Sequence, residues 1–144
     1  DLYHRYLDEY LEADDAGLHM MVNEHHQTAT CTDACAPLNL AILARQSRKG
    51  RLLILGNPVA NRGDPVRIAE QIAVIDNAFP GRLLITLGAG YRVEEFEMAG
   101  VDHATRGRIL EEQIRTVLEV SPRSGPKTTE VRSRTRIPAS GPDI

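Results

Sequence analysis

The sequence predicts an α/β fold built on parallel strands. Three short apolar segments begin near residues 19, 51 and 82, a spacing of about 31 residues that matches one strand–helix unit. Amphipathic helical segments separate them, and 42% of the 144 residues are hydrophobic, which is enough for the core of one domain. Strands joined through right-handed helical crossovers run parallel, so we expect their carboxyl ends to lie at one edge of the sheet.

The amino-terminal segment predicts a helix followed by a strand. Residues 2–16 repeat apolar and tyrosine side chains at helical spacing, and Gly17 stands where this helix ends. Residues 18–22, LHMMV, are short, mostly apolar and bounded by glycine and polar residues, which is typical of a buried strand. We therefore expect an amphipathic helix that leads into the first strand.

The next unit has the same order. A helix is predicted over residues 36–48, with a proline tolerated in its first turn and with Leu38, Ile42 and Leu43 facing inward. The strand that follows, RLLILGN over residues 51–57, is apolar without alternation. Such a strand is expected to be buried on both faces.

The second half of the chain continues this pattern. Asp64 and Pro65 combine a capping side chain with a proline at the first helical position, so a helix is predicted from here to about residue 78. The third strand is RLLITLGAG, residues 82–90. A last amphipathic helix is predicted over about residues 103–120, with an aspartate as its cap.

Residues 1–120 are predicted to form the domain, and residues 121–144 a linker or disordered tail. The tail holds four of the chain's eight prolines and no aromatic residue. Its five Arg and Lys against two Asp and Glu give it a charge of +3, which leaves −6 for residues 1–120 because the whole chain carries −3.

Composition excludes several classes of partner. A net charge of −3 favours neither nucleic acid nor an anionic membrane surface. No apolar run approaches the roughly 20 residues that span a bilayer, so no membrane segment is expected. Two cysteines are too few for a disulfide scaffold, which favours a reducing, cytoplasmic setting.

The polar end of the first strand, NEHH, holds adjacent histidines. Neighbouring side chains of an extended segment point to opposite faces, so His25 and His26 are poorly placed to share a metal ion. The Cys-x3-Cys spacing of Cys31 and Cys35 is also unusual for metal ligands, and we expect no metal site. Two interpretations remain: histidines hydrogen-bonded at a strand end, or a general base or polar contact to a cofactor.

The other two strand ends are rich in glycine. Gly56 and Asn57 precede a proline, a pattern that fits either a strained bulge or an ordinary loop. Gly88 and Gly90 allow a ligand to approach the backbone closely, as in loops that hold phosphate. The dinucleotide-binding fingerprint fails because Val93 stands where its third glycine belongs, which disfavours a nicotinamide cofactor.

Four blocks in order, VNEHHQT, LLILGNPV, DPVRIAEQIAVID and GRLLITLGAGYRVEEFEMAGVD, resemble the luciferase-like monooxygenase family over about residues 5–119. The resemblance implies a partial TIM (β/α)8 barrel, with three units similar to the second to fourth strands. It also implies that reduced FMN, or as the less favoured alternative a reduced deazaflavin, binds at the carboxyl ends of the strands. Oxygen then oxidises a small organic substrate, and a flavin reductase supplies the reduced flavin.

The resemblance also implies roles for individual residues. His25 matches a catalytic histidine that faces the flavin. Gly56 and Asn57 match a strand-end bulge, often with a non-proline cis peptide, that supports the flavin ring. The turn near the flavin phosphate comprises Gly88, Ala89 and Gly90. Relatives frequently have arginine where this chain has Ala89, and Arg92 is a nearby substitute.

Three strands leave the inner face and both edges of the sheet open, which predicts self-association into a homo-oligomer. The alternative to an enzyme is a non-catalytic flavin-binding or structural partial barrel. A third hypothesis is a barrel enzyme that acts on phosphorylated small molecules, with GAGY as its phosphate site.

Overall fold

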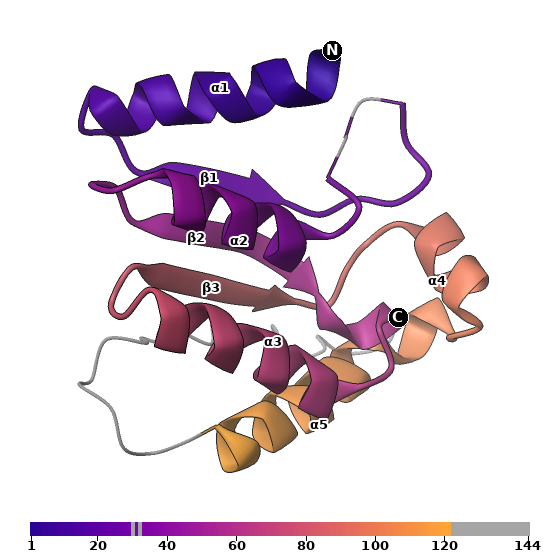
Figure 1. Cartoon of the computed structure of the whole chain (residues 1–144). Coiled ribbons are helices and arrows are strands. Elements are labelled where there is room, and N and C mark those ends of the chain that lie inside the picture. The colour runs from indigo at the N-terminus through magenta and orange to yellow at the C-terminus, as the bar shows by residue number, and fades with distance from the viewer. Residues whose placement is uncertain (30, 32, 122–144) are drawn as a thin grey trace, which may run out of the picture.

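The computed structural model describes residues 1–29, 31 and 33–121 (Figure 1). The predicted linker or disordered tail lies, apart from Ser121, outside these residues. Within them, no helix is both long and apolar enough to cross a bilayer.

A three-stranded parallel sheet forms the centre of the fold. Its strands are β1 (Met20–Asn23), β2 (Leu52–Pro58) and β3 (Leu83–Gly88), in the order β1-β2-β3. Both strand pairs are parallel. The predicted α/β class and parallel sheet are confirmed, and Figure 1 shows the arrowheads of all the strands pointing to the same edge.

Helices precede, connect and follow the strands as predicted. They are α1 (Leu2–Asp15), α2 (Ala36–Gln46), α3 (Pro65–Ala78) and α5 (Arg106–Val120), with short 3-10 turns η1 (Val59–Asn61) and η2 (His103–Thr105). Asp64 caps α3 through hydrogen bonds from the backbone N–H groups of Val66 and Arg67. Helix α4 (Val93–Ala99) was not predicted, because a helix this short shows too few repeats for a periodic pattern.

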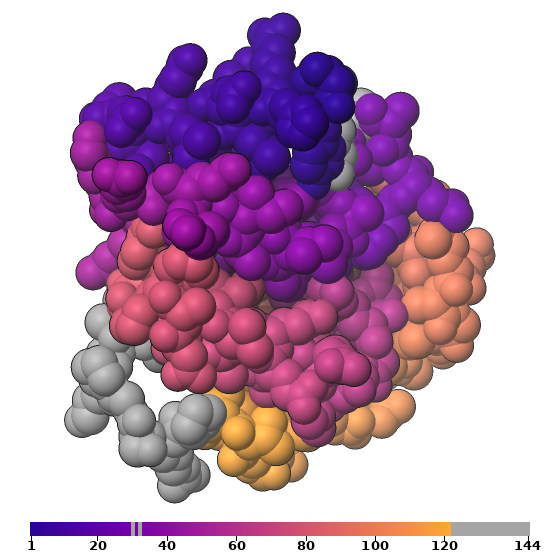
Figure 2. Space-filling view, in the orientation of Figure 1, coloured from indigo at the N-terminus to yellow at the C-terminus, as the bar shows by residue number. Residues whose placement is uncertain are grey.

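The core lies between one face of the sheet and helices α2 and α3. It contains Met20, Val22, Leu52, Ile54 and Leu83 from the strands, Ala36, Leu40, Leu43 and Ala44 from α2, and Ile75 from α3. Figure 2 shows α1, α2 and α3 packed side by side on this side of the molecule. The inward placement of Leu38 was wrong: its side chain is 62% exposed, because Leu40 and Leu43 direct the opposite side of α2 to the sheet.

The opposite face of the sheet is open within the described residues. Met21 and Leu55 point to this face and are 47% and 44% exposed. The prediction that the second strand is buried on both faces was therefore wrong, because helices α2 and α3 cover only alternate side chains. The expected open inner face of a partial barrel agrees with this arrangement.

At the amino-terminal end of the sheet, a buried carboxylate holds the turn between α2 and β2. Asp14 is 3% exposed and accepts hydrogen bonds from the backbone N–H groups of Arg48 (2.8 Å), Lys49 (3.1 Å) and Gly50. Burial raises the pKa of this carboxyl, but the three backbone hydrogen bonds and the nearby charge of Arg82 outweigh it. The pKa of Asp14 is therefore lower than its ordinary value.

Arg82 holds the same turn by donating hydrogen bonds to the acceptor groups of the turn. Its guanidinium donates hydrogen bonds of 2.8–3.1 Å to the carbonyl oxygens of Ala44, Ser47 and Gly50 and to the Ser47 hydroxyl. Asp14 and Arg82 thus satisfy donors and acceptors of one turn from two different elements. This end of the molecule is a stabilising structure, and it lies opposite the edge where the strands end.

Candidate functional site

The carboxyl ends of the three strands meet at a pocket of about 290 Å³. The lining residues are Asn23, Glu24, His25, Leu55, Gly56, Pro58, Gly88, Gly90, Tyr91 and Glu95. Of the residues that the sequence indicated, His25, Gly56, Gly88 and Gly90 line this pocket, whereas Asn57 and Ala89 do not. The polar strand ends therefore converge as expected, although the roles of these residues stay predictions.

A bulge in β2 forms one wall of the pocket. The pairing of β2 with β3 shifts in register between Ile54 and Asn57, and Gly56 has a φ of +71°. This left-handed conformation takes up the extra residue and favours glycine. The bulge agrees with the sequence, but the cis peptide that the resemblance gave as frequent is not present, because all peptide bonds of the described residues are trans.

The two glycines at the end of β3 differ in the space around them. A Cβ atom added to Gly88 would lie 3.5 Å from the Cα atom of Gly56, which is an ordinary van der Waals contact. Gly90 has a φ of +76°, and a Cβ atom there would approach Cε2 of Phe96 to 2.9 Å. Backbone conformation and lack of space thus both require glycine at position 90.

A buried polar network adjoins the pocket through Glu24 and includes Asn57. Glu24, 3% exposed, accepts a hydrogen bond from the backbone N–H of Ala36 at 2.8 Å. Its carboxylate also lies 3.3 Å from Nε2 of His26 and 3.1 Å from Nη1 of Arg62. Arg62 in turn donates to Oδ1 of Asn57 at 3.2 Å. Asn57 is completely buried, so it supports the bulge from behind.

His25 and His26 contact different carboxylates. The side chain of His25 is 25% exposed, and its Nδ1 atom lies 3.5 Å from Oε1 of Glu95. The same Glu95 oxygen accepts a hydrogen bond from the backbone N–H of His26 at 3.0 Å. The imidazole of His26 instead faces Glu24. The expectation that the two rings point apart agrees with this geometry.

Sequence reasoning missed Glu24, Arg62 and Glu95 as members of this site. Glu24 stands inside the NEHH motif, but nothing local distinguishes it from an exposed glutamate. Arg62 carries no signal at all. Glu95 belongs to α4, whose acidic first turn and terminal Gly100, with a φ of +67°, were the only local indications of a helix.

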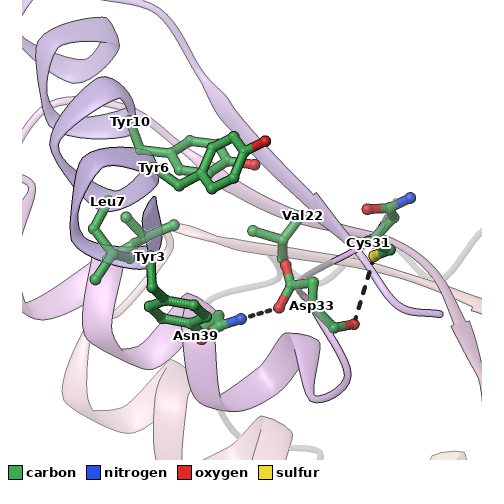
Figure 3. Close-up of a pocket in the computed structure, with 10 residues that line it drawn as sticks. Tyr3, Tyr6, Leu7, Tyr10, Val22, Cys31, Asp33 and Asn39 are labelled. Atoms are coloured by element: carbon green, nitrogen blue, oxygen red, sulfur yellow. Dashed lines mark hydrogen bonds between the residues drawn. The ribbon is translucent and has the colours of Figure 1, made fainter. Parts of the chain in front are cut away.

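A second pocket, of about 170 Å³, lies between α1 and the loop after β1 (Figure 3). Its polar groups bind one another: the Tyr3 hydroxyl donates to Oδ1 of Asn39, and Nδ2 of Asn39 donates to Oδ1 of Asp33. The Tyr10 hydroxyl donates to the carbonyl oxygen of Met21 at 2.9 Å. Burial raises the pKa values of Asp33 and Tyr10. These contacts join α1 to α2 and to β1, so we assign this pocket a structural role.

The cysteines form no disulfide and no metal site in the part of the chain that the structure describes. Cys31 and Cys35 are free thiols. In the same part, no group of three or more His, Cys, Asp or Glu side chains is arranged to hold a metal ion.

Comparison with known proteins identifies a family. The sequence profile of the luciferase-like monooxygenases matches residues 3–142. No curated protein matches the chain. Among solved structures, the chain is similar to a type II Baeyer–Villiger monooxygenase, the oxygenating constituent of 3,6-diketocamphane monooxygenase from the CAM plasmid of Pseudomonas putida, in complex with FMN. That match has a TM-score of 0.74 and 19% identity, and it covers 79% of this chain and 32% of the other.

Two further structures have the same fold. Monooxygenase RslO1 from Streptomyces bottropensis gives a TM-score of 0.71 at 24% identity, covering 77% of this chain and 34% of the other. The apo form of MsnO8 gives 0.65 at 19% identity, covering 92% and 41%. The chain thus spans between 32% and 41% of the length of these structures.

Proposed function

Since the chain belongs to the luciferase-like monooxygenase family, we propose that it forms part of a flavin-dependent monooxygenase that oxidises a small organic substrate with oxygen. The observation that carries this proposal is the convergence of His25, Gly56, Gly88 and Gly90 on one pocket at the carboxyl ends of the strands. In parallel barrel enzymes, this edge of the sheet is where active sites are built.

In this proposal the three strand–helix units are the second to fourth units of a TIM (β/α)8 barrel. The open sheet face around Met21 and Leu55 is then the inner face of that barrel. The coverage of 32–41% of the similar structures supports this, because three of eight units are about that share.

The residues of the pocket fit a flavin ring. Gly56 has no atom within 4 Å of the position that a Cβ atom would take, so its backbone leaves open space toward the pocket. A volume of about 290 Å³ is near the lower end of ligand pockets, roughly 300–1,000 Å³, so it holds only part of FMN. Reduced FMN, when bound, supplies the electrons that activate oxygen, and a separate flavin reductase provides it in this form. A reduced deazaflavin is the less favoured cofactor.

Each residue then has a defined task. His25 holds or accepts a proton at the pocket, since neutral imidazole is both donor and acceptor. Gly56 and the buried Asn57 shape the bulge against the flavin ring. The phosphate lies at the turn formed by Gly88, Ala89 and Gly90. Arg92 follows this turn by two residues and offers a positive charge, although it lies 3.7 Å from the exposed carboxylate of Glu94.

The proposed flavin site predicts a loss of FMN binding in Gly88→Val. The branched side chain would push against the backbone of Gly56 and narrow the pocket, so we expect the Kd for reduced FMN to rise at least about tenfold. Anaerobic fluorescence titration measures this change. Ala104→Val, on an exposed turn, is the control and should bind like the unmodified protein. An equal Kd for reduced FMN in the unmodified protein, Gly88→Val and Ala104→Val would contradict the proposed site.

We also propose that the open sheet face makes the chain self-associate as a homo-oligomer. Met21→Gln places a polar group on that face and is expected to shift sedimentation toward the monomer. Leu2→Gln alters a side chain of α1 that is 60% exposed, and it should leave the distribution unchanged. If the unmodified protein sediments as a monomer at all concentrations, this homo-oligomer is excluded.

A further inference from the structure

A buried glutamate faces the imidazole of His25 from an element far away in sequence. Glu95 belongs to α4, which Figure 1 shows at the edge toward which the strand arrowheads point. Its side chain is 3% exposed, and its Oε1 atom lies 3.5 Å from Nδ1 of His25. Nδ1 is itself buried and has no hydrogen-bond partner within the described residues. A hydrogen bond between Nδ1 of His25 and the Glu95 carboxylate would satisfy the hydrogen-bonding capacity of both buried groups.

The carboxylate of Glu95 has no cationic partner from Arg or Lys among the described residues. It accepts a hydrogen bond from the backbone N–H of His26. Arg92 pairs with Glu94 and Arg62 pairs with Glu24. A buried carboxylate without a cation is costly unless hydrogen bonds satisfy it. When Nδ1 of His25 carries a proton, it can donate a further hydrogen bond to the Glu95 carboxylate.

His25 also lines the pocket. Its Nδ1 atom is buried while a quarter of the side chain is exposed, so the exposed atoms belong to the rest of the side chain. The ring of Tyr91 meets His25 edge-on, with centroids 5.7 Å apart. The 3.5 Å separation between Nδ1 and Glu95 is longer than a typical hydrogen bond, and such contacts often shorten when an active site binds its ligand.

We propose that Glu95 is a positioning residue for His25. Its carboxylate accepts the hydrogen bond from Nδ1–H and holds the neutral imidazole in the Nδ1–H tautomer. Nε2 then keeps its lone pair on the pocket side, where it accepts a proton or hydrogen bond from a ligand. The role of His25 toward a ligand rests on the proposed function. The tautomer of its imidazole does not, because we expect the same tautomer in the flavin-free protein.

Nitrogen-15 NMR of the flavin-free protein tests this tautomer. The imidazole shifts at a pH where the ring is neutral report which nitrogen carries the proton, and the His25 signals are identified by their loss in His25→Ala. We expect Nδ1–H in the unmodified protein. In Glu95→Met, which removes every acceptor, His25 should change to the Nε2–H form that a free histidine side chain favours.

Glu95→Gln is the second variant, in case Glu95→Met does not fold. Glutamine keeps an oxygen for the His26 N–H but loses the charge, so the Nδ1–H population is expected to fall partially. Glu94→Gln is the matched control, because Glu94 is the preceding residue and its side chain is 67% exposed; His25 should keep its tautomer there. Nε2–H in the unmodified protein, or Nδ1–H retained in each folded Glu95 variant, would overturn the proposal.

A kinetic measurement separates positioning from general stability. Glu95→Gln is expected to lower turnover at least about tenfold with little change in the Kd for FMN, as is usual when a supporting partner of a functional histidine is lost. If the protein binds no flavin, the proposed function fails, yet the NMR result still decides whether Glu95 sets the tautomer.

Discussion

His25→Ala is expected to reduce flavin-dependent oxygenation by about 10²–10⁴-fold, the range that a positioned general acid or base contributes. The Kd for reduced FMN should change little, because the glycine walls of the pocket remain. The measurement is turnover with reduced FMN, oxygen and an organic substrate, together with an anaerobic binding titration. A loss confined to turnover identifies a group that acts on the reaction.

His26→Ala is the matched control for this prediction. His26 lies next to His25 in sequence, but its imidazole contacts the buried Glu24. We therefore expect His26→Ala to lower the free energy of unfolding. Turnover by the protein that remains folded should change little. Equal turnover by His25→Ala and the unmodified protein would contradict the catalytic role. A protein that binds FMN but shows no turnover would instead support the alternative of a non-catalytic flavin-binding partial barrel.

The largest expected loss of stability is that of Asp14→Asn. Three backbone N–H groups converge on the buried carboxylate, and an asparagine would direct an NH₂ group at some of these donors. Hydrogen bonds to a charged group contribute about 1.5–3 kcal/mol, and leaving buried donors without an acceptor adds to the cost. We expect the free energy of unfolding to fall by about 2–4 kcal/mol in urea denaturation.

The exposed neighbour Asp15 provides the control. Its side chain is 84% exposed and lies 3.5 Å from Nζ of Lys49, so Asp15→Asn should change stability by less than about 0.5 kcal/mol. Equal stability of Asp14→Asn and Asp15→Asn would show that the turn does not depend on the buried carboxylate.

The pH dependence of stability should have the same origin. The pKa of Asp14 is lower in the folded protein than in the unfolded chain, so the folded state binds this proton less readily. Its contribution is complete above the unfolded-state pKa and is lost as the pH falls through the lowered folded-state pKa. The acid side of the stability profile should therefore flatten in Asp14→Asn, which has no proton to bind at this position.

Local patterns in the sequence were sufficient for the elements that contain several helical turns or a full apolar strand. The start of α3 at Pro65 follows from two adjacent residues, because a cap and a proline act within one turn. The failures were of a different kind. Leu38 and the second face of β2 were assigned to the core because apolar character alone does not tell which side another element covers.

The sequence by itself determined the α/β class, the parallel order of the strands and the edge where His25, Gly56 and Gly88 meet. These depend on period and spacing, which are local properties of the chain. The family was indicated separately, by the resemblance of four ordered sequence blocks. Only the tertiary structure placed Glu95 beside His25, Arg62 between Glu24 and Asn57, and Asp14 under the turn after α2. Each of these contacts joins residues from separate elements, and burial then gives a carboxylate or guanidinium a partner that no local pattern specifies.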